Sequence, residues 1–161
     1  MRKMKILTIK NKKDEGFLRT PVPPTDLSSM TKADIRAIIT DMRRTLSETA
    51  DGVGLSANQV GLSVRLFIVR YDNKFYAVFD PVITKRSDEE ELESEGCLSV
   101  PGIQLPVSRS KRITLSGRNQ AGKKITLSAS GILARIFQHE TDHLDGILFT
   151  DRVSENTSIN Y

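Results

Sequence analysis

Nine residues near the C-terminal end, QHETDHLDG at residues 138–146, constrain this chain more than any other segment. They contain His139 and His143, the only two histidines in the sequence, with Glu140 directly after the first. Residues four apart lie one above the other on a helix, with Cβ atoms about 5–6 Å apart, so both rings can bind one metal ion. Glu140 projects along the flank of that face, where it can reach a metal-bound water as a general base. The HExxH spacing therefore predicts a metal site on a helix, and the alternative is two polar residues on an exposed helical face.

Two helices are predicted, and the second carries this motif. Ser130 can cap a helix from about residue 131 to 144, and Gly146 can end it. An earlier segment predicts a helix from about residue 31 to 49, because its apolar residues follow the i, i+3, i+4, i+7 spacing. These apolar residues are Ile35, Ile38, Ile39, Met42 and Leu46.

The chain between the two helices is predicted to form strands. Residues 64–69 and 75–79 alternate as strands around a turn at Asp72 and Asn73, and residues 112–117 and 124–128 as a hairpin. Asp80, Pro81 and the acidic run at residues 88–93 are predicted as loop. The order of elements predicts an α+β fold, with mostly antiparallel β-sheets surrounding a central helix that carries the HExxH motif and one further long N-terminal helix.

The length of 161 residues suits a single domain with a buried core, which we predict over residues 1–161. Residues 1–30 are predicted to be an irregular N-terminal arm, because Pro21, Pro23 and Pro24 lie among polar residues there. Residues 153–161 are predicted to be a flexible tail.

The composition restricts the compartment and the partners. The basic N-terminus is not followed by an apolar run, and no run reaches transmembrane length, so neither a secretory signal nor a membrane partner is expected. Cys97 is the only cysteine, which excludes an internal disulfide and favours a reducing, cytoplasmic compartment. The net charge is +4 without a concentrated basic stripe, so no specific nucleic-acid recognition is expected, although a mild attraction to a polyanionic surface stays open. We expect a monomer.

A catalytic zinc-type site usually has three protein ligands, and the HExxH proteases take the third from a downstream residue. Phe149 stands where the metzincin signature requires a histidine, and Glu155, the only glutamate after Glu140, lies near the chain end. An HExxH endopeptidase is therefore poorly supported.

The remaining soft ligand is Cys97, in the stretch EGCLS at residues 95–99. Alone it is typical of a small buried hydrophobic residue, but beside two histidines that lack a third ligand it becomes the better candidate. A thiolate favours Zn(II) or Fe(II). Gly96 allows close approach of the backbone, and the amide of Leu98 could face a developing oxyanion.

Asp142, in the same helix, has two interpretations. It could hydrogen-bond a ring nitrogen of a metal-ligating histidine, or pair with an arginine such as Arg109 as structural support. We favour the structural pairing.

Three stretches together resemble the peptide deformylase family. GVGLSANQ at residues 52–59 is similar to its GxGLAAxQ motif, EGCLS at 95–99 to its EGCLS motif, and QHETDH at 138–143 to its QHExDH motif. Their order and spacing also agree, and the resemblance covers about residues 4–152. It implies removal of the formyl group from N-formylmethionine at the start of nascent peptides, and proximity to the ribosome.

The resemblance also implies a role for each matching residue. Cys97, His139 and His143 would hold one divalent metal ion, typically Fe(II), with Zn(II) or Ni(II) able to substitute. Glu140 would take a proton from metal-bound water and pass it to the leaving amine. The side chain of Gln59, otherwise a polar residue at a loop end, and the backbone N–H of Leu98 would stabilise the tetrahedral intermediate.

The substrate-binding residues follow from the same resemblance. Gly54 would let the peptide backbone lie close, much as an added strand, and Gly96 would do the same beside the metal ligand. Val53, Ile132 and Ile136 would line an apolar pocket for the methionine side chain, although core packing explains these three residues equally well.

Three features depart from the family pattern. Ser56 stands where the family most often has alanine, and adds a hydroxyl near the site. Gln104 stands where many members carry arginine, so either the contacts with the peptide backbone or the substrate preference is expected to differ. The chain ends soon after Arg152, without the long C-terminal helix of many members. A non-catalytic homologue that binds metal or nascent peptides stays open as an alternative function.

Overall fold

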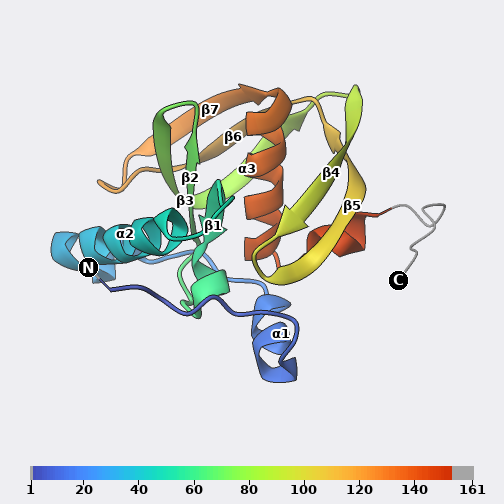
Figure 1. Ribbon diagram of the computed structural model, residues 1–161. Coiled ribbons are helices and arrows are strands. Elements are labelled where there is room, and N and C mark those ends of the chain that lie inside the picture. The colour runs from blue at the N-terminus through green and yellow to red at the C-terminus, as the bar shows by residue number, and fades with distance from the viewer. Residues whose placement is uncertain (1, 154–161) are drawn as a thin grey trace.

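The computed structural model describes residues 2–153 and has seven strands and three α-helices in that range (Figure 1). The helices are α1 (Lys12–Leu18), α2 (Lys32–Ser47) and α3 (Gly131–Leu144), with three short 3-10 helices at Leu27–Ser29, Ala57–Val60 and Phe149–Arg152. The strands are β1 (Gly54–Ser56), β2 (Leu66–Tyr71), β3 (Lys74–Arg86), β4 (Glu90–Cys97), β5 (Val100–Ser110), β6 (Arg112–Arg118) and β7 (Lys124–Ser130).

The strands form two antiparallel sheets with α3 between them. Five strands pair in the order β1-β2-β3-β6-β7, and β4 pairs with β5 in a separate two-stranded sheet. Figure 1 shows α3 standing in the middle, with the larger sheet on one side and β4–β5 on the other. This arrangement confirms the predicted α+β fold. No helix within residues 2–153 is both long and apolar enough to cross a membrane.

Helix α2 forms where the apolar periodicity predicts it. Thr31 caps its N-terminus, since its hydroxyl accepts from the Asp34 N–H while the Asp34 carboxylate accepts from the Thr31 N–H. Its apolar stripe packs on one face of the large sheet, against Leu55, Leu66 and Ile68. Strand β1 is the next element after α2 and leads into the site. Burial of the apolar stripe of α2 therefore also fixes the position of β1.

Helix α3 is buried on two sides, one of which is apolar and the other polar. Its apolar side packs on the large sheet, where the Phe137 ring lies 5.6 Å from that of Phe67 and 5.2 Å from that of Tyr76, measured between centroids. Its polar side faces β4–β5 and carries both histidines. Ser130 occupies the N-cap position without a side-chain capping bond, and Gly146 follows the C-terminus with φ of 75°.

The two predicted hairpins are present. Asp72 and Asn73 both have positive φ, 52° and 58°, the conformation of a two-residue turn whose twist matches the flanking strands. Strands β6 and β7 pair from Arg112 with Ser130 to Arg118 with Lys124.

The loop predicted at Asp80 and Pro81 is wrong, and so is most of the loop predicted at residues 88–93, where only Asp88 and Glu89 lie outside a strand. Strand β3 continues through Pro81 to Arg86, because a bulge between Phe79 and Val82 removes the need for an N–H at the proline. Asp80, with φ of 48°, stabilises this kink by pairing with Arg118 and accepting from the Thr25 N–H. The acidic run also enters a strand, β4, where its carboxylates stay mostly exposed.

The predicted irregular arm at residues 1–30 needs correction as well. It contains α1, whose N-terminus is capped by the Asn11 side chain, and the 3-10 helix at Leu27–Ser29, capped by Asp26. Helix α1 has 7 residues and the 3-10 helix has 3, too few for either to show an apolar period in the sequence. The flexible tail predicted at residues 153–161 lies, beyond Val153, outside the described residues.

Candidate metal centre and active site

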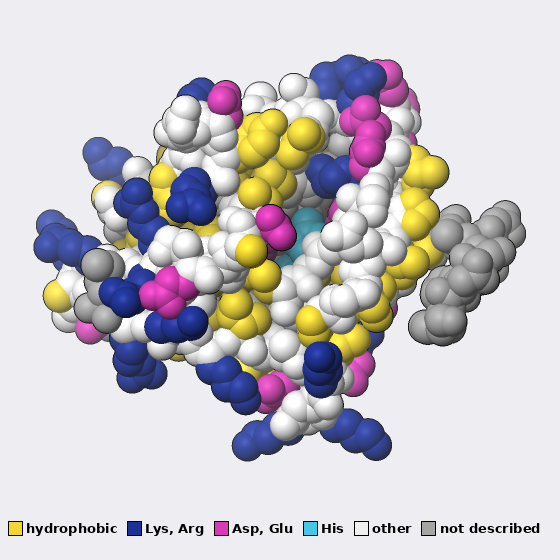
Figure 2. Space-filling view, viewed as in Figure 1, with side chains coloured by type: hydrophobic (Ala, Val, Ile, Leu, Met, Phe, Trp, Pro, Cys, Tyr) yellow, Lys and Arg dark blue, Asp and Glu magenta, His cyan; other side chains and the backbone are white. Residues whose placement is uncertain are grey.

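A pocket of about 580 Å³ opens between the large sheet and β4–β5. Figure 2 shows it as a hollow near the middle of the face, with a histidine side chain visible at its floor and apolar side chains on its rim. Its lining comes from the loop after α2 with β1, the 3-10 helix at Ala57–Val60, the end of β4 with the turn that follows, the first half of β5, and α3. The pocket therefore collects residues that are up to 89 positions apart, from Asp51 to Glu140.

Cys97 and His139 line this pocket and meet the buried His143 beneath its floor, with one candidate ligand atom of each residue within 4.8 Å of the others. Nε2 of His143 lies 3.2 Å from Nε2 of His139 and 3.2 Å from Sγ of Cys97. Two nitrogen ligands in a tetrahedral zinc-type site lie about 3.3 Å apart, at bond lengths of about 2.0–2.1 Å. The structure thus brings the three residues to the spacing that one divalent cation requires.

Each of these three side chains is positioned by the helix or strand that carries it. The two histidines lie one turn apart on α3, and their rings pack edge to face with centroids 4.9 Å apart. Cys97 is the last residue of β4, and the Ser99 N–H in the following turn donates to its Sγ at 3.4 Å. The Asn58 side chain donates to the His143 carbonyl at 2.6 Å and so joins the end of α3 to the segment after β1.

Glu95 orients the His139 ring, a role that the sequence analysis did not assign. Its Oε1 lies 2.8 Å from Nδ1 of His139. Because a carboxylate only accepts, Nδ1 carries a proton, and Nε2 is the nitrogen left to point toward the other two side chains of the cluster. Burial opposes ionisation of Glu95, yet hydrogen bonds from Arg109 and His139 outweigh it and hold the pKa of this carboxyl well below its usual range.

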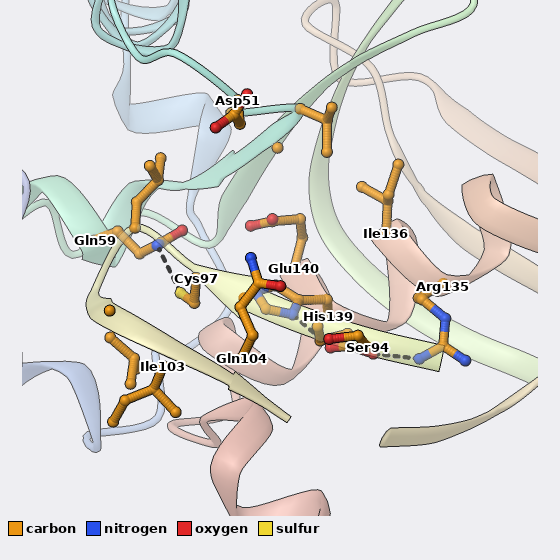
Figure 3. A pocket seen from close by; sticks show the side chains of 18 residues that line it. Asp51, Gln59, Ser94, Cys97, Ile103, Gln104, Arg135, Ile136, His139 and Glu140 are labelled. Atoms are coloured by element: carbon orange, nitrogen blue, oxygen red, sulfur yellow. Dashed lines mark hydrogen bonds and ion pairs between the residues drawn. The ribbon is translucent and has the colours of Figure 1, made fainter. Parts of the chain in front are cut away.

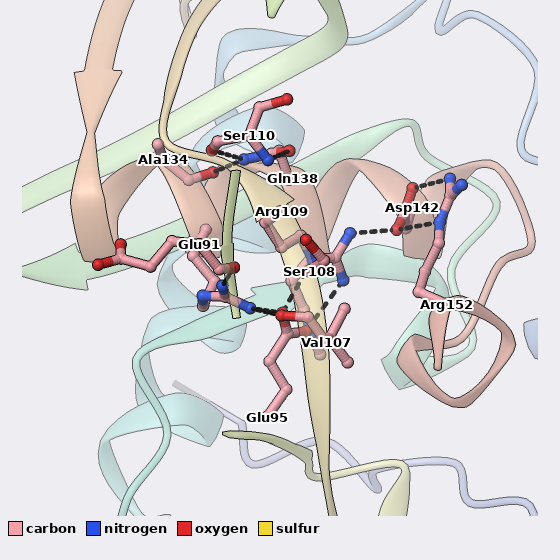
Figure 4. Close-up of polar contacts among 12 residues, drawn as sticks. Glu91, Glu95, Val107, Ser108, Arg109, Ser110, Ala134, Gln138, Asp142 and Arg152 are labelled. Carbon is pink, nitrogen blue, oxygen red and sulfur yellow. Dashed lines mark hydrogen bonds and ion pairs between the residues drawn. The ribbon is translucent and has the colours of Figure 1, made fainter. Parts of the chain in front are cut away.

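A buried ion network supports this carboxylate (Figure 4). Arg109 donates to both oxygens of Glu95, at 2.8 and 2.9 Å, and to Asp142 Oδ2 at 2.6 Å. Arg135 donates to Glu95 from the other side, and Arg152 donates to both oxygens of Asp142. The structural pairing predicted for Asp142 with Arg109 is confirmed, and the partner of the histidine is Glu95 rather than Asp142.

Substituting Arg109 with methionine is expected to lower the free energy of unfolding by about 3–5 kcal/mol, because it leaves two buried carboxylates short of a partner. The Arg109 side chain is 5% exposed. Urea unfolding followed by circular dichroism measures the effect. Arg112→Met is the matched control, since Arg112 is 61% exposed in its ion pair with Glu89 and such pairs contribute about 0–1 kcal/mol. Equal, small losses in both variants would contradict the structural role of the network.

The charged groups around Cys97 and His139 favour the binding of a cation at the floor of the pocket. Burial raises the pKa of the Cys97 thiol, but hydrogen bonds and charges from His143 and His139 outweigh burial and hold this pKa well below its ordinary value. Burial lowers the pKa of His139, and contacts with Cys97 and Glu95 outweigh it and raise the pKa to about 10. The centre of the cluster thus attracts positive charge, and a thiolate with two imidazoles is a donor set for a borderline-soft divalent metal.

Glu140 lies beside the ligand cluster and faces the pocket (Figure 3). It is 4% exposed, and burial raises its pKa, which the charges of both histidines and the Ser56 hydroxyl only partly offset. A carboxylate with a raised pKa can both accept and return a proton near neutral pH. These properties would suit a general base that also returns the proton.

The Gln59 amide is oriented by its own segment. Its Oε1 accepts from the Ser56 N–H at 2.9 Å, so its NH₂ group points toward Cys97 Sγ, at 3.6 Å, and Ser99 Oγ, at 3.1 Å. Figure 3 shows Gln59 beside Cys97 at one side of the pocket. Leu98 follows in the turn after β4 and also lines the pocket. Both residues therefore border the pocket next to Cys97.

Four of the five predicted substrate-binding residues line the pocket: Val53, Gly54, Gly96 and Ile136. Ile132 does not, and its side chain is 60% exposed at the first turn of α3. Ile132 lies one turn before Ile136, toward the N-terminus of the helix, so its place in the methionine pocket stays a prediction.

Gln104 lies on β5 across from Gly96 and lines the pocket (Figure 3). A Cβ at Gly96 would be 3.4 Å from Cγ of Gln104, an ordinary van der Waals distance, so the two positions are neighbours beside Cys97. Asp51 lies at the outer rim of the same pocket.

Phe149, at the position where the metzincin signature requires a histidine, belongs to the core. It is 1% exposed and packs with Val100, Val107 and Leu148. Its ring stacks on that of His139, with centroids 6.1 Å apart and an interplanar angle of 24°. Phe149 therefore supports the ring of His139 and has no nitrogen to offer to a metal ion.

Comparisons with known proteins agree with this site. A family model described as polypeptide deformylase matches residues 3–158. The peptide deformylase of Treponema pallidum (strain Nichols) is 43% identical over 141 residues, covering 86% of each chain. The crystal structure of peptide deformylase from Thermotoga maritima matches with a TM-score of 0.86 and 35% identity, covering 96% of this chain and 99% of that one. A peptide deformylase from Synechococcus elongatus in complex with actinonin matches with a TM-score of 0.84 and 33% identity, covering 95% and 80%. The chain therefore belongs to the polypeptide deformylase family of hydrolases.

Proposed function

We propose that this protein removes the formyl group from the N-terminal formylmethionine of nascent polypeptides. One observation carries the proposal: a buried carboxyl group, that of Glu140, lies beside a Cys-His-His ligand cluster at the floor of an open pocket. A hydrolase for a small carbonyl group needs a proton acceptor, oxyanion donors and room for the rest of the substrate, and this pocket offers all three.

Cys97, His139 and His143 would hold one divalent cation, for which we propose Fe(II), with Zn(II) or Ni(II) as substitutes. The thiolate excludes a preference for hard, oxygen-loving ions. When bound, such a cation supplies Lewis-acid polarisation of the formyl oxygen and a lowered pKa for the attacking water.

The protein's own groups would carry the protons and the charge. Glu140 takes a proton from the water as the oxygen attacks the formyl carbon, and returns it to the amine nitrogen as the C–N bond breaks. Formate and the free N-terminal amine of methionine are the products. The Gln59 NH₂ group and the Leu98 N–H donate to the formyl oxygen while negative charge develops there.

The walls of the pocket would position the peptide. Gly54 on β1 and Gly96 on β4 border it from opposite sides, so an extended peptide can lie between the two strands. Val53 and Ile136 provide apolar surface for the methionine side chain. Gln104 then faces the residues that follow methionine, where it donates and accepts hydrogen bonds without adding charge.

Gln59→Leu is expected to reduce kcat for formate release by about 10²-fold, because it removes one oxyanion donor and keeps the size of the side chain. Steady-state kinetics on a formyl-methionyl peptide measure the effect, with metal content determined for both proteins. Gln104→Leu serves as the control within the same pocket, and is expected to change KM more than kcat. Equal kcat values for Gln59→Leu and wild type would remove Gln59 from the mechanism.

The proposal is tested by mass spectrometry of a peptide that carries formylmethionine at its N-terminus and several internal peptide bonds. Loss of the formyl group alone, with every peptide bond intact, is the expected product. Cleavage within the peptide would instead identify an endopeptidase. An unchanged peptide in the presence of metal-loaded protein would favour a non-catalytic homologue that only binds metal or nascent chains.

A further inference from the structure

Strand β1 contacts both oxygens of the Glu140 carboxylate. Gly54 and Ser56 are two residues apart, so they point to the same side of the strand, and this side faces α3. A Cβ at Gly54 would lie 2.5 Å from Oε1 of Glu140, so this position leaves no room for a larger residue unless the carboxylate moves. Oγ of Ser56 donates to Oε2 at 2.7 Å. Oε1 therefore fits because Gly54 has no side chain, and Oε2 is held by the hydroxyl of Ser56.

The Ser56 side chain is fully buried, and it does not line the pocket. Its Oγ also lies 2.9 Å from the main-chain oxygen of Glu140, so both acceptors belong to one residue. A hydroxyl is donor and acceptor together, so it keeps this contact whether or not Glu140 holds the proton that it transfers. The Ser56 N–H meanwhile fixes the Gln59 amide. One residue therefore contacts both groups that the proposed reaction requires to be oriented.

We propose that Ser56 is a positioning residue, whose hydroxyl holds the Glu140 carboxylate toward the ligand cluster. The expected effect on kcat rests on the proposed function. The expected effect on the position of the Glu140 carboxylate does not depend on it. Among residues 2–153, Ser56 is the only hydrogen-bond partner of the Glu140 carboxylate, so without the hydroxyl no hydrogen bond from these residues opposes rotation about the last side-chain bond of Glu140. Small misplacements of a catalytic group reduce the rate of the chemical step and leave substrate binding unchanged.

Ser56→Ala is expected to lower kcat by about 10-fold, the value of one hydrogen bond to a charged group, with KM unchanged. Alanine removes only the hydroxyl, and the fold accommodates the smaller side chain because the main-chain bond to Gln59 stays. Thr45→Val is the matched control, since Thr45 is 1% exposed and its hydroxyl donates within α2, to the Asp41 carbonyl. This variant is expected to lose stability without a change in kcat per bound metal.

The test combines kinetics with crystal structures of metal-loaded wild type and Ser56→Ala. We expect one Glu140 rotamer in wild type and a displaced or divided carboxylate in the variant, together with the fall in kcat. A Glu140 carboxylate that stays in place in Ser56→Ala overturns the inference, whatever the kinetics show. A kcat equal to that of wild type overturns it as well.

The same experiment separates the two proposals. If wild type releases no formate, the proposed function fails, and the crystal structures alone decide whether Ser56 positions Glu140. If wild type releases formate and Ser56→Ala does so at the same rate, the function stands and the role of Ser56 is refuted.

Discussion

Replacing Glu140 with glutamine is expected to reduce kcat for formate release by about 10²–10⁴-fold while the metal stays bound, the range that general acid–base catalysis contributes. The amide of glutamine has the size of the carboxyl group and its oxygen can still accept from the Ser56 hydroxyl, but it cannot take a proton. Glu140→Ala is expected to show a similar loss. Neither substitution changes one of the three side chains that we propose as metal ligands, Cys97, His139 and His143.

The measurement is formate release under substrate saturation, with metal content and far-UV circular dichroism recorded for each protein. Glu93→Gln is the matched control, because Glu93 is an exposed carboxylate on β4. It is expected to keep wild-type kinetics. Full activity in Glu140→Ala with a normal metal content would disprove the role of Glu140 as the base.

Replacing Cys97 with alanine is expected to abolish stoichiometric metal binding and to reduce formate release at least 10³-fold. The substitution leaves two imidazoles without the thiolate, and a site with two protein ligands falls short of the three that catalytic sites of this type use. Cys97→Ser tests the soft donor separately, because it keeps an atom of similar position but exchanges sulfur for oxygen. We expect intermediate metal retention for Cys97→Ser.

Anaerobic purification followed by elemental analysis measures the metal in all three proteins, and unfolding curves show that each is folded. Because Cys97 lies at the end of β4 and not in a strand centre, alanine is expected to leave the two-stranded sheet paired. If Cys97→Ala retains one metal per chain, the third ligand comes from elsewhere and the assignment is wrong.

Local patterns predicted those parts of the fold that local interactions stabilise. The helix α2 follows from its apolar period and its cap at Thr31, and the β2–β3 turn follows from Asp72 and Asn73, which tolerate positive φ. The continuation of β3 past Pro81 depends instead on a bulge that Asp80 stabilises with Arg118, 38 residues away. No pattern within residues 80–93 contains that partner.

The candidate site divides in the same way. The spacing of His139 and His143 reports a helix directly, and the resemblance of three stretches indicated that Cys97 joins them. The roles of Glu95 and Ser56 were not predicted, because each depends on a side chain 44 or 84 residues away in the sequence. Apolar character does not distinguish a pocket wall from an exposed first turn of a helix, so the role of Ile132 stays a prediction.

The central claim is that formate release depends on one metal ion held by the Cys-His-His cluster. Its most direct test is formate release from a formyl-methionyl peptide by anaerobically purified protein, measured against metal content as the metal is removed by a chelator and restored. The account predicts that activity falls and recovers in proportion to bound metal, up to one ion per chain. Formate release that persists in the metal-free protein, or none from the fully loaded protein, would contradict it.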